Sequence, residues 1–167
     1  MRTPSKEKLL DLALERELKS SETFRSWILG RTRFAGESAV VTFLRADWPW
    51  GKVNLRVWSP ITETYTTVAK EGETDLLVVF QSKERGRFAL HIENKLSAGH
   101  FTDYQPDLYR SRASAWSGNP AYGDYEEWET VLVAPDSFYQ RNLREARKFD
   151  RFISHTDLAA FVPEFGS

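Results

Sequence analysis

The stretch "ETDLLVVFQSKERGRFALHIENK", residues 73 to 95, decides the fold expected for this chain. It contains two apolar runs separated by the charged turn "QSKERGR", a pattern that predicts two strands joined as a hairpin. Asp75, Glu93 and Lys95 stand where apolar residues are expected, although charged side chains seldom lie inside buried strands. These three residues therefore call for a specific explanation.

The second strand, "RFALHIENK", has two different faces because successive side chains of a strand point in opposite directions. One face is apolar and is expected to pack on a core: Phe88, Leu90 and Ile92. Glu93 and Lys95 fall on the other face together with His91, for which we expect a structural role. An acid and a base thus lie two residues apart on one face of the sheet.

The pairing of the two strands brings a second acid to this face. We take Phe80 opposite Phe88, since a loop of this length does not set the register. This register places Asp75 opposite Glu93, with Cβ atoms about 4.5 to 5.5 Å apart in a destabilising like-charge contact. A divalent cation such as Mg²⁺ would remove the repulsion. The alternative is a surface salt bridge of Lys95 with Glu93 or Asp75 on a solvated face.

The rest of the chain predicts helices and strands in an order typical of an α/β fold. Helices are expected at residues 5–19, at 20–32, from about 102–106 onward, and at 136–150. Further strands are expected at residues 38–44, 52–58 and 129–135, and at the start of 152–162. We therefore predict one domain, residues 1–167, with a central mixed β-sheet flanked by helices.

Composition and charge limit the classes of partner. The 167 residues carry 23 Lys and Arg against 24 Asp and Glu, a formal net charge of −1, so any nucleic-acid surface must be local. The absence of cysteine excludes disulfides, thiolate metal sites and cysteine nucleophiles, and it fits a reducing cytoplasm. The sequence has no signal-peptide pattern and no apolar run of membrane-spanning length, so we expect a cytoplasmic protein without a membrane partner.

An acid on one strand followed by Glu-x-Lys on the next resembles the hallmark of the PD-(D/E)xK nuclease superfamily. Here the acid is Asp75, and Glu93-Asn94-Lys95 forms the second part, while Thr74 stands at the position of the proline. The elements follow in the order helix, strand, Asp-strand, Glu-x-Lys strand, helix and strand, which extends the resemblance over roughly residues 9 to 154. The resemblance implies a restriction-endonuclease-like core.

The resemblance also implies an activity and a metal. A nuclease of this superfamily would hydrolyse phosphodiester bonds of nucleic acid, with DNA favoured over RNA, using Mg²⁺ or Mn²⁺. Asp75, Glu93 and the backbone carbonyl of Asn94 would hold the metal. Lys95 would orient or help deprotonate the attacking water, or stabilise the charge that develops on the phosphate.

The first helix supplies a candidate for a third acid. Many members of the superfamily carry an acidic residue on the first helix that faces the site. On a helical wheel Glu17 falls within the apolar arc around Leu10, whereas Glu15 points away. Glu17 is therefore the candidate for a further metal ligand, and the alternative is a boundary residue at the edge of the apolar stripe.

Three polar residues follow on the helix after the Glu-x-Lys strand. Gln105, Tyr109 and Arg112 share one helix face and resemble the Gln-x-x-x-Tyr element of exonuclease-like members. An amide, a phenol and a guanidinium suit a phosphate and a stacked base, so we expect them to position the substrate strand. The alternative is a helix that packs Leu108 and Tyr109 on the sheet while Arg112 meets solvent.

Several alternatives stay open at this point. Trp48 and Trp50 form either a base-stacking edge or a lid on the core, and the basic residues between positions 141 and 151 form either a phosphate-binding edge or a solvated helix face. A second class of function is a catalytically inactive nuclease-like fold that binds nucleic acid or a protein. The cleavage mode, the pathway, the number of metals and the oligomeric state, a homodimer included, stay open as well.

Overall fold

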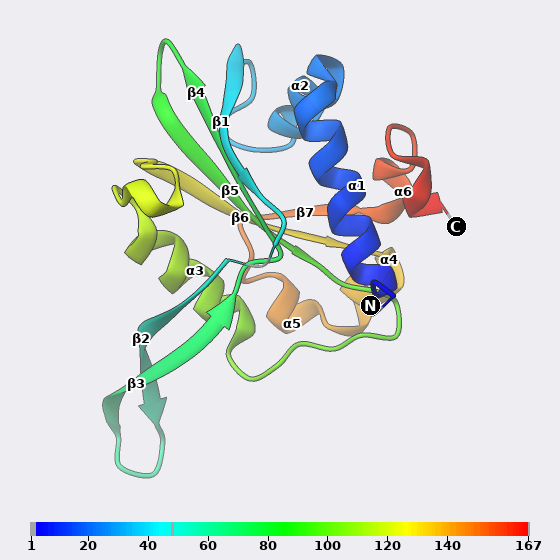
Figure 1. Ribbon diagram of the computed structural model, residues 1–167. Coiled ribbons are helices and arrows are strands. Elements are labelled where there is room, and N and C mark those ends of the chain that lie inside the picture. The colour runs from blue at the N-terminus through cyan, green and yellow to red at the C-terminus, as the bar shows by residue number, and fades with distance from the viewer. Residues whose placement is uncertain (1–2, 48, 167) are drawn as a thin grey trace.

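The computed structural model describes residues 3–47 and 49–166, with the backbone alone at Trp50. Its centre is a five-stranded sheet in the order β1-β4-β5-β6-β7 (Figure 1). The strands are β1 (Ala39–Arg45), β4 (Leu76–Ser82), β5 (Gly86–Asn94), β6 (Glu127–Ala134) and β7 (Arg151–Ser154). The pairs β1–β4 and β4–β5 are antiparallel, and β5–β6 and β6–β7 are parallel, which confirms the predicted mixed sheet.

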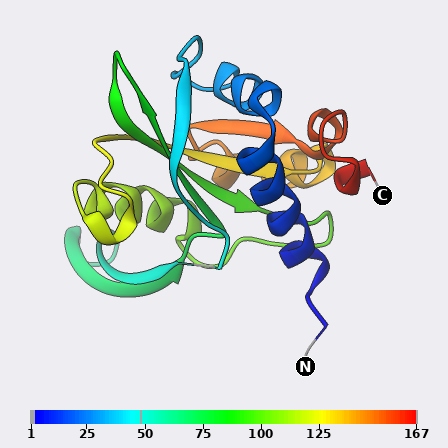
Figure 2. The same cartoon turned by 45° about the horizontal axis from the view of Figure 1, so that its top comes forward.

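Helices cover both faces of this sheet, which confirms the predicted α/β class (Figures 1 and 2). Apolar residues of α1, α2 and α6 pack on one face, and those of α3, α4 and α5 pack on the other. The helices are α1 (Lys6–Ser20), α2 (Glu22–Gly30), α3 (Gln105–Trp116), α4 (Asp136–Arg141), α5 (Leu143–Ala146) and α6 (His155–Leu158), with the 3-10 turns η1 (Pro120–Tyr122) and η2 (Pro163–Gly166). Within the described residues, no helix has the length and apolar character needed to cross a membrane.

Strand β4 is buried on both faces, and this explains its unbroken apolar sequence. Leu76, Val78 and Phe80 belong to the core under α1 and α2. Leu77 and Val79 belong to the core under α3. The chain that enters this strand is therefore held by packing on two sides, which makes it a rigid support for the residues beside it.

The hairpin formed by β4 and β5 has the predicted register. Phe80 pairs with Phe88, and their stacked rings have centroids 5.6 Å apart. The pairing continues in this register to the first residue of β4, so the next pair outward is Asp75 and Glu93. The turn closes at Gly86 with φ of 74°, a left-handed conformation that favours glycine.

A second sheet of two strands was only half predicted. Strand β2 (Trp50–Ser59) pairs antiparallel with β3 (Thr64–Glu73), and together they form the β2–β3 ribbon, which projects from the body in Figure 1 and curves beside α3 in Figure 2. Strand β3 escaped prediction because it is polar and largely exposed, without the apolar alternation of a half-buried strand. Val53 and Leu55 of β2 pack on Leu108 of α3, which anchors the ribbon.

The prediction of one continuous helix over residues 136–150 is wrong. Helix α4 ends at Arg141 and α5 begins at Leu143, with Asn142 between them at φ of −119° and ψ of 31°. The Asn142 side-chain amide donates a hydrogen bond to the carbonyl of Phe138 at 3.0 Å. The Asn142 backbone N–H donates to the same carbonyl at 3.0 Å, so the break follows from the non-helical φ of Asn142 and not from a lost bond.

Candidate metal centre

Three carboxylates meet at the end of the sheet where β5 leaves the hairpin. Oxygen atoms of Glu7, Asp75 and Glu93 all lie within 4.8 Å of one another. Asp75 stands just before β4, Glu93 lies at the end of β5, and Glu7 lies in the first turn of α1. Asp75 is 4% exposed and Glu93 is 2% exposed, so two of the three acids are buried. The predicted pair of acids is thus brought together, and a third joins it.

The third acid is Glu7 and not Glu17, which corrects the expectation for the first helix. Glu17 lies ten residues further along α1, about 15 Å at the helical rise, and its carboxylate lies 3.4 Å from Arg16 Nε. On the helical wheel Glu7 falls between Leu14 and Leu18, inside the buried stripe of α1. Glu17 also falls within the apolar arc, so helical periodicity could have proposed Glu7 but could not choose between the two acids.

Lys95 forms an ion pair with Glu93, but not on a solvated surface. Its Nζ lies 3.2 Å from Glu93 Oε1 and donates a hydrogen bond to the His100 carbonyl at 3.0 Å. The residue is 9% exposed, and its ammonium lies 5.5 Å from the centre of the Phe101 ring. The alternative of a surface salt bridge is therefore right about the ion pair with Glu93 and wrong about its exposure, because both residues are buried. A buried pair of this kind costs desolvation energy and is weak evidence for a purely stabilising role.

Asn94 joins the acids to the opposite face of the sheet. Its backbone N–H donates to Asp75 Oδ2 at 2.9 Å. The N–H and C=O of one residue in an extended strand point to the same side, so the Asn94 carbonyl also faces Asp75, as the predicted metal ligand requires. Its side-chain Nδ2 donates to Asp11 Oδ1 at 3.2 Å, and its Oδ1 lies 3.0 Å from His155 Nε2. Neither Asp11 nor His155 was predicted from the sequence as part of this site.

Tyr109 lies beneath the acids and not on the surface where a substrate strand would pass. Its hydroxyl donates a hydrogen bond to Glu93 Oε2 and accepts one from the backbone N–H of Asp75 at 3.0 Å. The side chain is fully buried. Burial and the nearby charge of Glu93 raise the pKa of Tyr109 well above its ordinary value, so the phenol remains a donor. The structure therefore places Tyr109 as a positioning residue for the two carboxylates.

Arg112 is also buried, contrary to the alternative in which it meets solvent. Its Nη2 donates to the Glu73 carbonyl at 2.6 Å, and the guanidinium lies 4.6 Å from the centre of the Tyr109 ring. A Cβ at Gly72 would lie 2.5 Å from Arg112 Nη1, so a larger residue there would displace the guanidinium. Burial lowers the pKa of Arg112 from its ordinary value.

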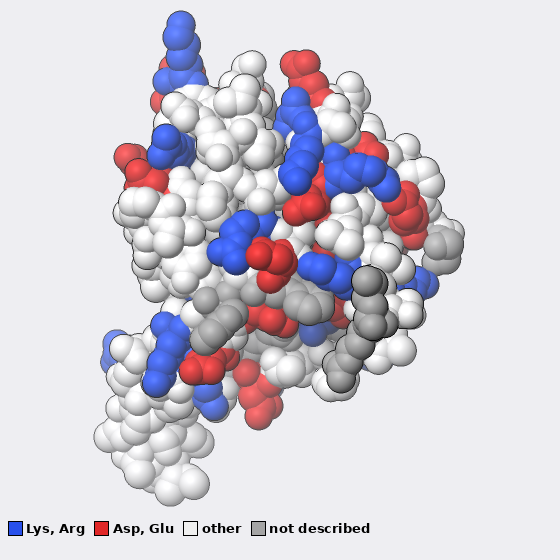
Figure 3. Space-filling model, in the orientation of Figure 1, with Lys and Arg blue, Asp and Glu red and all other residues white. Residues whose placement is uncertain are grey.

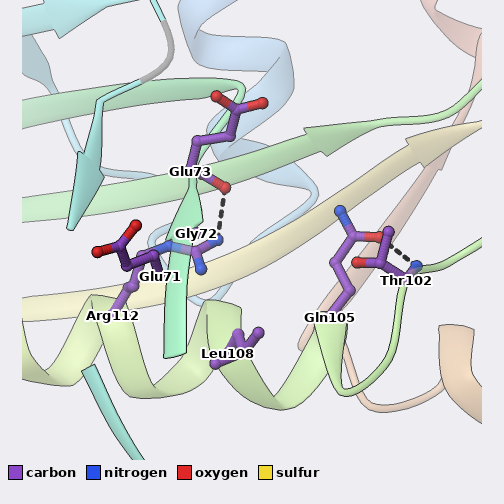
Figure 4. Close-up of a pocket in the computed structure, with 7 residues that line it drawn as sticks. All are labelled: Glu71, Gly72, Glu73, Thr102, Gln105, Leu108 and Arg112. Atoms are coloured by element: carbon purple, nitrogen blue, oxygen red, sulfur yellow. Dashed lines mark hydrogen bonds between the residues drawn. The ribbon is translucent and has the colours of Figure 1, made fainter. Parts of the chain in front are cut away.

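Gln105 and Arg112 line one cleft of about 380 Å³ beside the ribbon (Figure 4). Gln105 Oε1 accepts a hydrogen bond from the backbone N–H of Thr102 at 3.2 Å, at the start of α3. In Figure 4 the guanidinium of Arg112 lies beside Gly72 and reaches the Glu73 carbonyl. Of the three residues expected to position a strand, Gln105 and Arg112 thus line a cleft and Tyr109 does not.

The acids resist ionisation in the absence of a cation. Burial, followed by the charge of Glu93, raises the pKa of Asp75 well above its ordinary value. Burial raises the pKa of Glu93, while the Lys95 charge and the Tyr109 hydrogen bond lower it. Burial and then the charge of Glu93 raise the pKa of Glu7. A hard divalent cation would offset this repulsion, and carboxylate oxygens are the ligands that Mg²⁺ and Mn²⁺ accept.

His91 has the structural role expected for it. The ring is fully buried, with Nδ1 3.1 Å from Thr74 Oγ1 and Nε2 2.9 Å from the Tyr125 hydroxyl. Burial lowers the pKa of His91 to about 3, so the imidazole is neutral in the folded protein. It therefore fixes Thr74, the residue before Asp75, to the layer under α3.

The basic residues between positions 141 and 151 are paired to a large extent. Lys148 lies 3.3 Å from Asp107, and Arg151 lies 3.0 Å from Glu129. Arg141 donates to the Ser97 carbonyl at 2.5 Å. These contacts favour a structural face over a phosphate-binding edge. The stacking edge suggested for Trp48 and Trp50 falls outside the described residues at Trp48 and outside the described side chains at Trp50.

Comparison of the chain with models of protein families, with curated proteins and with solved structures finds no match.

Proposed function

We propose that this chain is a metal-dependent nuclease that hydrolyses phosphodiester bonds of nucleic acid, with DNA favoured over RNA, on a restriction-endonuclease-like core. One observation carries the proposal: Glu7, Asp75 and Glu93 present oxygens within 4.8 Å of one another at the end of the sheet. The buried ammonium of Lys95 stands 3.2 Å from one of them. This set matches the acid, Glu and Lys of the resemblance, with Glu7 in place of Glu17.

The donor set suits Mg²⁺ or Mn²⁺. Asp75, Glu93 and Glu7 would hold the ion through carboxylate oxygens, together with the Asn94 carbonyl, and all of these are hard ligands. When bound, such an ion polarises a phosphate and lowers the pKa of a bound water. The residues themselves remain in place without it, since Asn94 and Tyr109 hold Asp75 and Glu93 through hydrogen bonds.

Lys95 would contribute the positive charge that the reaction needs beside the acids. Its ammonium is fixed by Glu93 and by the His100 carbonyl, so its position costs no reorganisation when a substrate enters. A preorganised charge of this kind stabilises developing negative charge on phosphate oxygens and can orient a water molecule. Tyr109 acts through the acids, because its hydroxyl touches Glu93 and the Asp75 backbone and no solvent.

Arg112 supports a role for the cleft in binding a neighbouring phosphate. Among the described residues no carboxylate forms an ion pair with Arg112, although the guanidinium is almost fully buried. Its Nη2 binds a backbone carbonyl at the wall of the cleft, and the charges of Glu93, Asp75 and Glu73 act on the guanidinium without forming an ion pair with it. A phosphate is the ligand that such a guanidinium recognises best. Gln105 lines the same cleft and would add an amide contact.

The test is cleavage together with metal binding. The purified protein is incubated with linear, circular and single-stranded DNA and with RNA, in Mn²⁺ or EDTA, beside Glu93→Ala. Glu17→Gln serves as the control, since it removes a charge from α1 outside the cluster. We expect metal-dependent cleavage by the wild type and the control and none by Glu93→Ala. Binding of nucleic acid without cleavage would instead identify the inactive binding module.

A melting scan in Mg²⁺, Mn²⁺ and EDTA provides an independent readout. A ligand that binds only the folded state raises the free energy of unfolding by mass action, about 2.7 kcal/mol at a concentration of 100 Kd. We expect the metal to raise the melting temperature of the wild type and of Glu17→Gln. The rise should be absent in Glu93→Ala, and a rise of equal size there would contradict the metal site.

A further inference from the structure

We infer that the exposed face of the β2–β3 ribbon binds unpaired bases of a single-stranded nucleic acid and holds that strand beside the acid cluster. The inference rests on the proposed function for its purpose and names the class of substrate. It is carried by three side chains of one ribbon face: Arg56, Trp58 and Tyr65.

The ribbon has one covered and one open face. Val53 and Leu55 point to α3 and are buried, so the alternate residues of β2 point away from the body. Trp58 pairs directly with Tyr65 across the ribbon, and the two rings have centroids 5.0 Å apart. Trp58 is 49% exposed and Tyr65 is 57% exposed, so the pair presents two adjoining aromatic rings to solvent.

Cations stand on the same open face. The Arg56 guanidinium lies 4.4 Å from the centre of the Tyr65 ring. Lys52 shares this face and is exposed. Within the described part of the chain, neither Arg56 nor Lys52 forms an ion pair. Glu71 stands opposite Lys52 on the paired strand, so Arg56 is the cation closest to the open rings. A guanidinium beside two open aromatic rings matches a phosphate backbone with bases that stack.

The aromatic rings select unpaired bases over a duplex. A duplex hides the faces of its bases, whereas a single strand offers each base for stacking on an aromatic side chain. The charge of the ribbon is balanced, because its three basic residues, Lys52, Arg56 and Lys70, stand beside Glu63, Glu71 and Glu73. On the face seen in Figure 3 the coloured atoms of the ribbon lie at its end nearest the sheet, while Glu63 belongs to the turn at the far end. Base stacking on the aromatic rings is therefore expected to contribute more to binding than attraction by a broad basic surface.

The ribbon leads directly to the acid cluster. Strand β3 ends at Glu73, and Asp75 follows after a single residue. Tyr65 precedes Asp75 by ten residues, which is at most about 33 Å along an extended strand. A stacked nucleic-acid strand would cover that distance in about ten nucleotides at 3.4 Å each. One continuous strand of moderate length could thus contact the ribbon and the acids together.

The experiment measures binding in EDTA, so that cleavage has no part in it. Fluorescence anisotropy of a labelled single strand of about 20 nucleotides, long enough to span the ribbon, is compared with that of a duplex of equal length. The variants are Arg56→Gln and Trp58→Leu. Lys70→Gln is the matched control, because Lys70 pairs with Val53 and therefore lies on the covered face of the same ribbon.

We expect Trp58→Leu to raise the Kd for the single strand at least about tenfold, as for lost base stacking, and Arg56→Gln to raise it by about tenfold through loss of a phosphate contact and of the charge beside Tyr65. Lys70→Gln should change it by about threefold or less, as for a single long-range charge. The wild type should prefer the single strand to the duplex. Equal effects of Arg56→Gln and Lys70→Gln, equal binding of the duplex, or no binding by the wild type would each overturn the inference.

Two measurements keep the outcome decisive. Circular dichroism and limited proteolysis establish that the ribbon is formed in each variant. Arg56→Gln keeps the Trp58–Tyr65 pair intact, so it still tests the inference if Trp58→Leu proves unstable. Glu93→Ala is measured in the same binding assay and in the cleavage assay. Normal single-strand binding by the ribbon variants with intact wild-type cleavage would overturn the ribbon alone. Binding that depends on the ribbon, without cleavage by the wild type in Mn²⁺, would overturn the proposed function and leave the ribbon inference standing.

Discussion

The acid cluster and the β2–β3 ribbon differ in how far their functional side chains are buried and in how those side chains are held. In the cluster Asp75 and Glu93 are buried and each is held by hydrogen bonds from another element. On the ribbon Trp58 and Tyr65 are about half exposed and are held by each other. Chemistry requires groups fixed to within a fraction of an ångström, whereas binding of a flexible strand tolerates an open surface.

This contrast means that changes in the cluster should affect chemistry and stability together, while changes on the ribbon should affect binding alone. The sheet end is covered from both faces, by α1 on one side and α3 on the other. The ribbon is covered on one face only. Variants of the two regions therefore test this division.

The largest effect is expected for Lys95→Met. Loss of one preorganised charge typically costs about 10² to 10³ in rate, roughly 2.7 to 4 kcal/mol. Because Lys95 is not a proposed metal ligand, the metal-induced rise in melting temperature should persist in this variant. Lys95→Arg should restore little of the rate, because its planar fork places the charge differently. Cleavage by Lys95→Met at nearly the wild-type rate would contradict the role given to the ammonium.

Tyr109→Phe should lower both stability and the rate of cleavage. The change leaves the Asp75 N–H and a Glu93 oxygen without their partner in a buried place, which typically costs about 1 to 3 kcal/mol. Chemical denaturation in EDTA measures the loss of stability, and steady-state kinetics measures kcat. A positioning role predicts a lower kcat with little change in KM. A large rise in KM alone would show that the phenol contacts substrate.

His91 should make the metal-free protein less stable in mild acid. Its pKa is about 3 in the folded protein and near 6.5 when unfolded, so between these values the unfolded chain binds the additional proton. The contribution of His91 to the free energy of unfolding therefore falls as the pH drops below 6.5, by about 2 kcal/mol at pH 5. Urea titrations in EDTA should show the free energy of unfolding of the wild type falling by about this amount relative to that of His91→Gln between pH 7 and pH 5, and identical slopes would contradict this assignment.

Glu7→Gln and Glu17→Gln separate the two readings of the first helix. Loss of a metal-binding carboxylate should weaken metal affinity by about tenfold, or roughly 1.4 kcal/mol. We expect this change in Glu7→Gln and no measurable change in Glu17→Gln, since Glu17 lies beside Arg16 and far from the cluster. Titration with Mn²⁺ followed by melting temperature provides the affinities. A larger effect at Glu17 would restore the original prediction.

The smallest effect on stability is expected for Trp58→Leu. Cross-strand aromatic pairs contribute about 0.2 to 1 kcal/mol, and Trp58 packs on no core cluster among the described residues. The melting temperature should therefore shift by no more than a few degrees, at about 2 to 4 °C per kcal/mol for a chain of this length. A cooperative loss of several kcal/mol would show that the ribbon supports the fold and is not a separate binding surface.

Local patterns in the sequence predicted the central part of the molecule. Alternation of side chains in "RFALHIENK" and one assumed pair, Phe80 with Phe88, placed Asp75 beside Glu93, as the structure has it. Strand geometry repeats every two residues, so a short stretch is sufficient to determine which side chains share a face. The order of helices and strands likewise predicted the α/β class and the mixed sheet.

Only the tertiary structure decided which distant residues complete the site. The choice of Glu7 over Glu17 depends on which turn of α1 docks against the end of the sheet, and helical periodicity places both on similar faces. The burial of Tyr109 and Arg112 depends on how α3 packs, and the polar strand β3 forms because β2 supplies its hydrogen-bond partners. Periodicity determines the direction of a side chain about its own element, whereas docking between elements determines what that side chain meets.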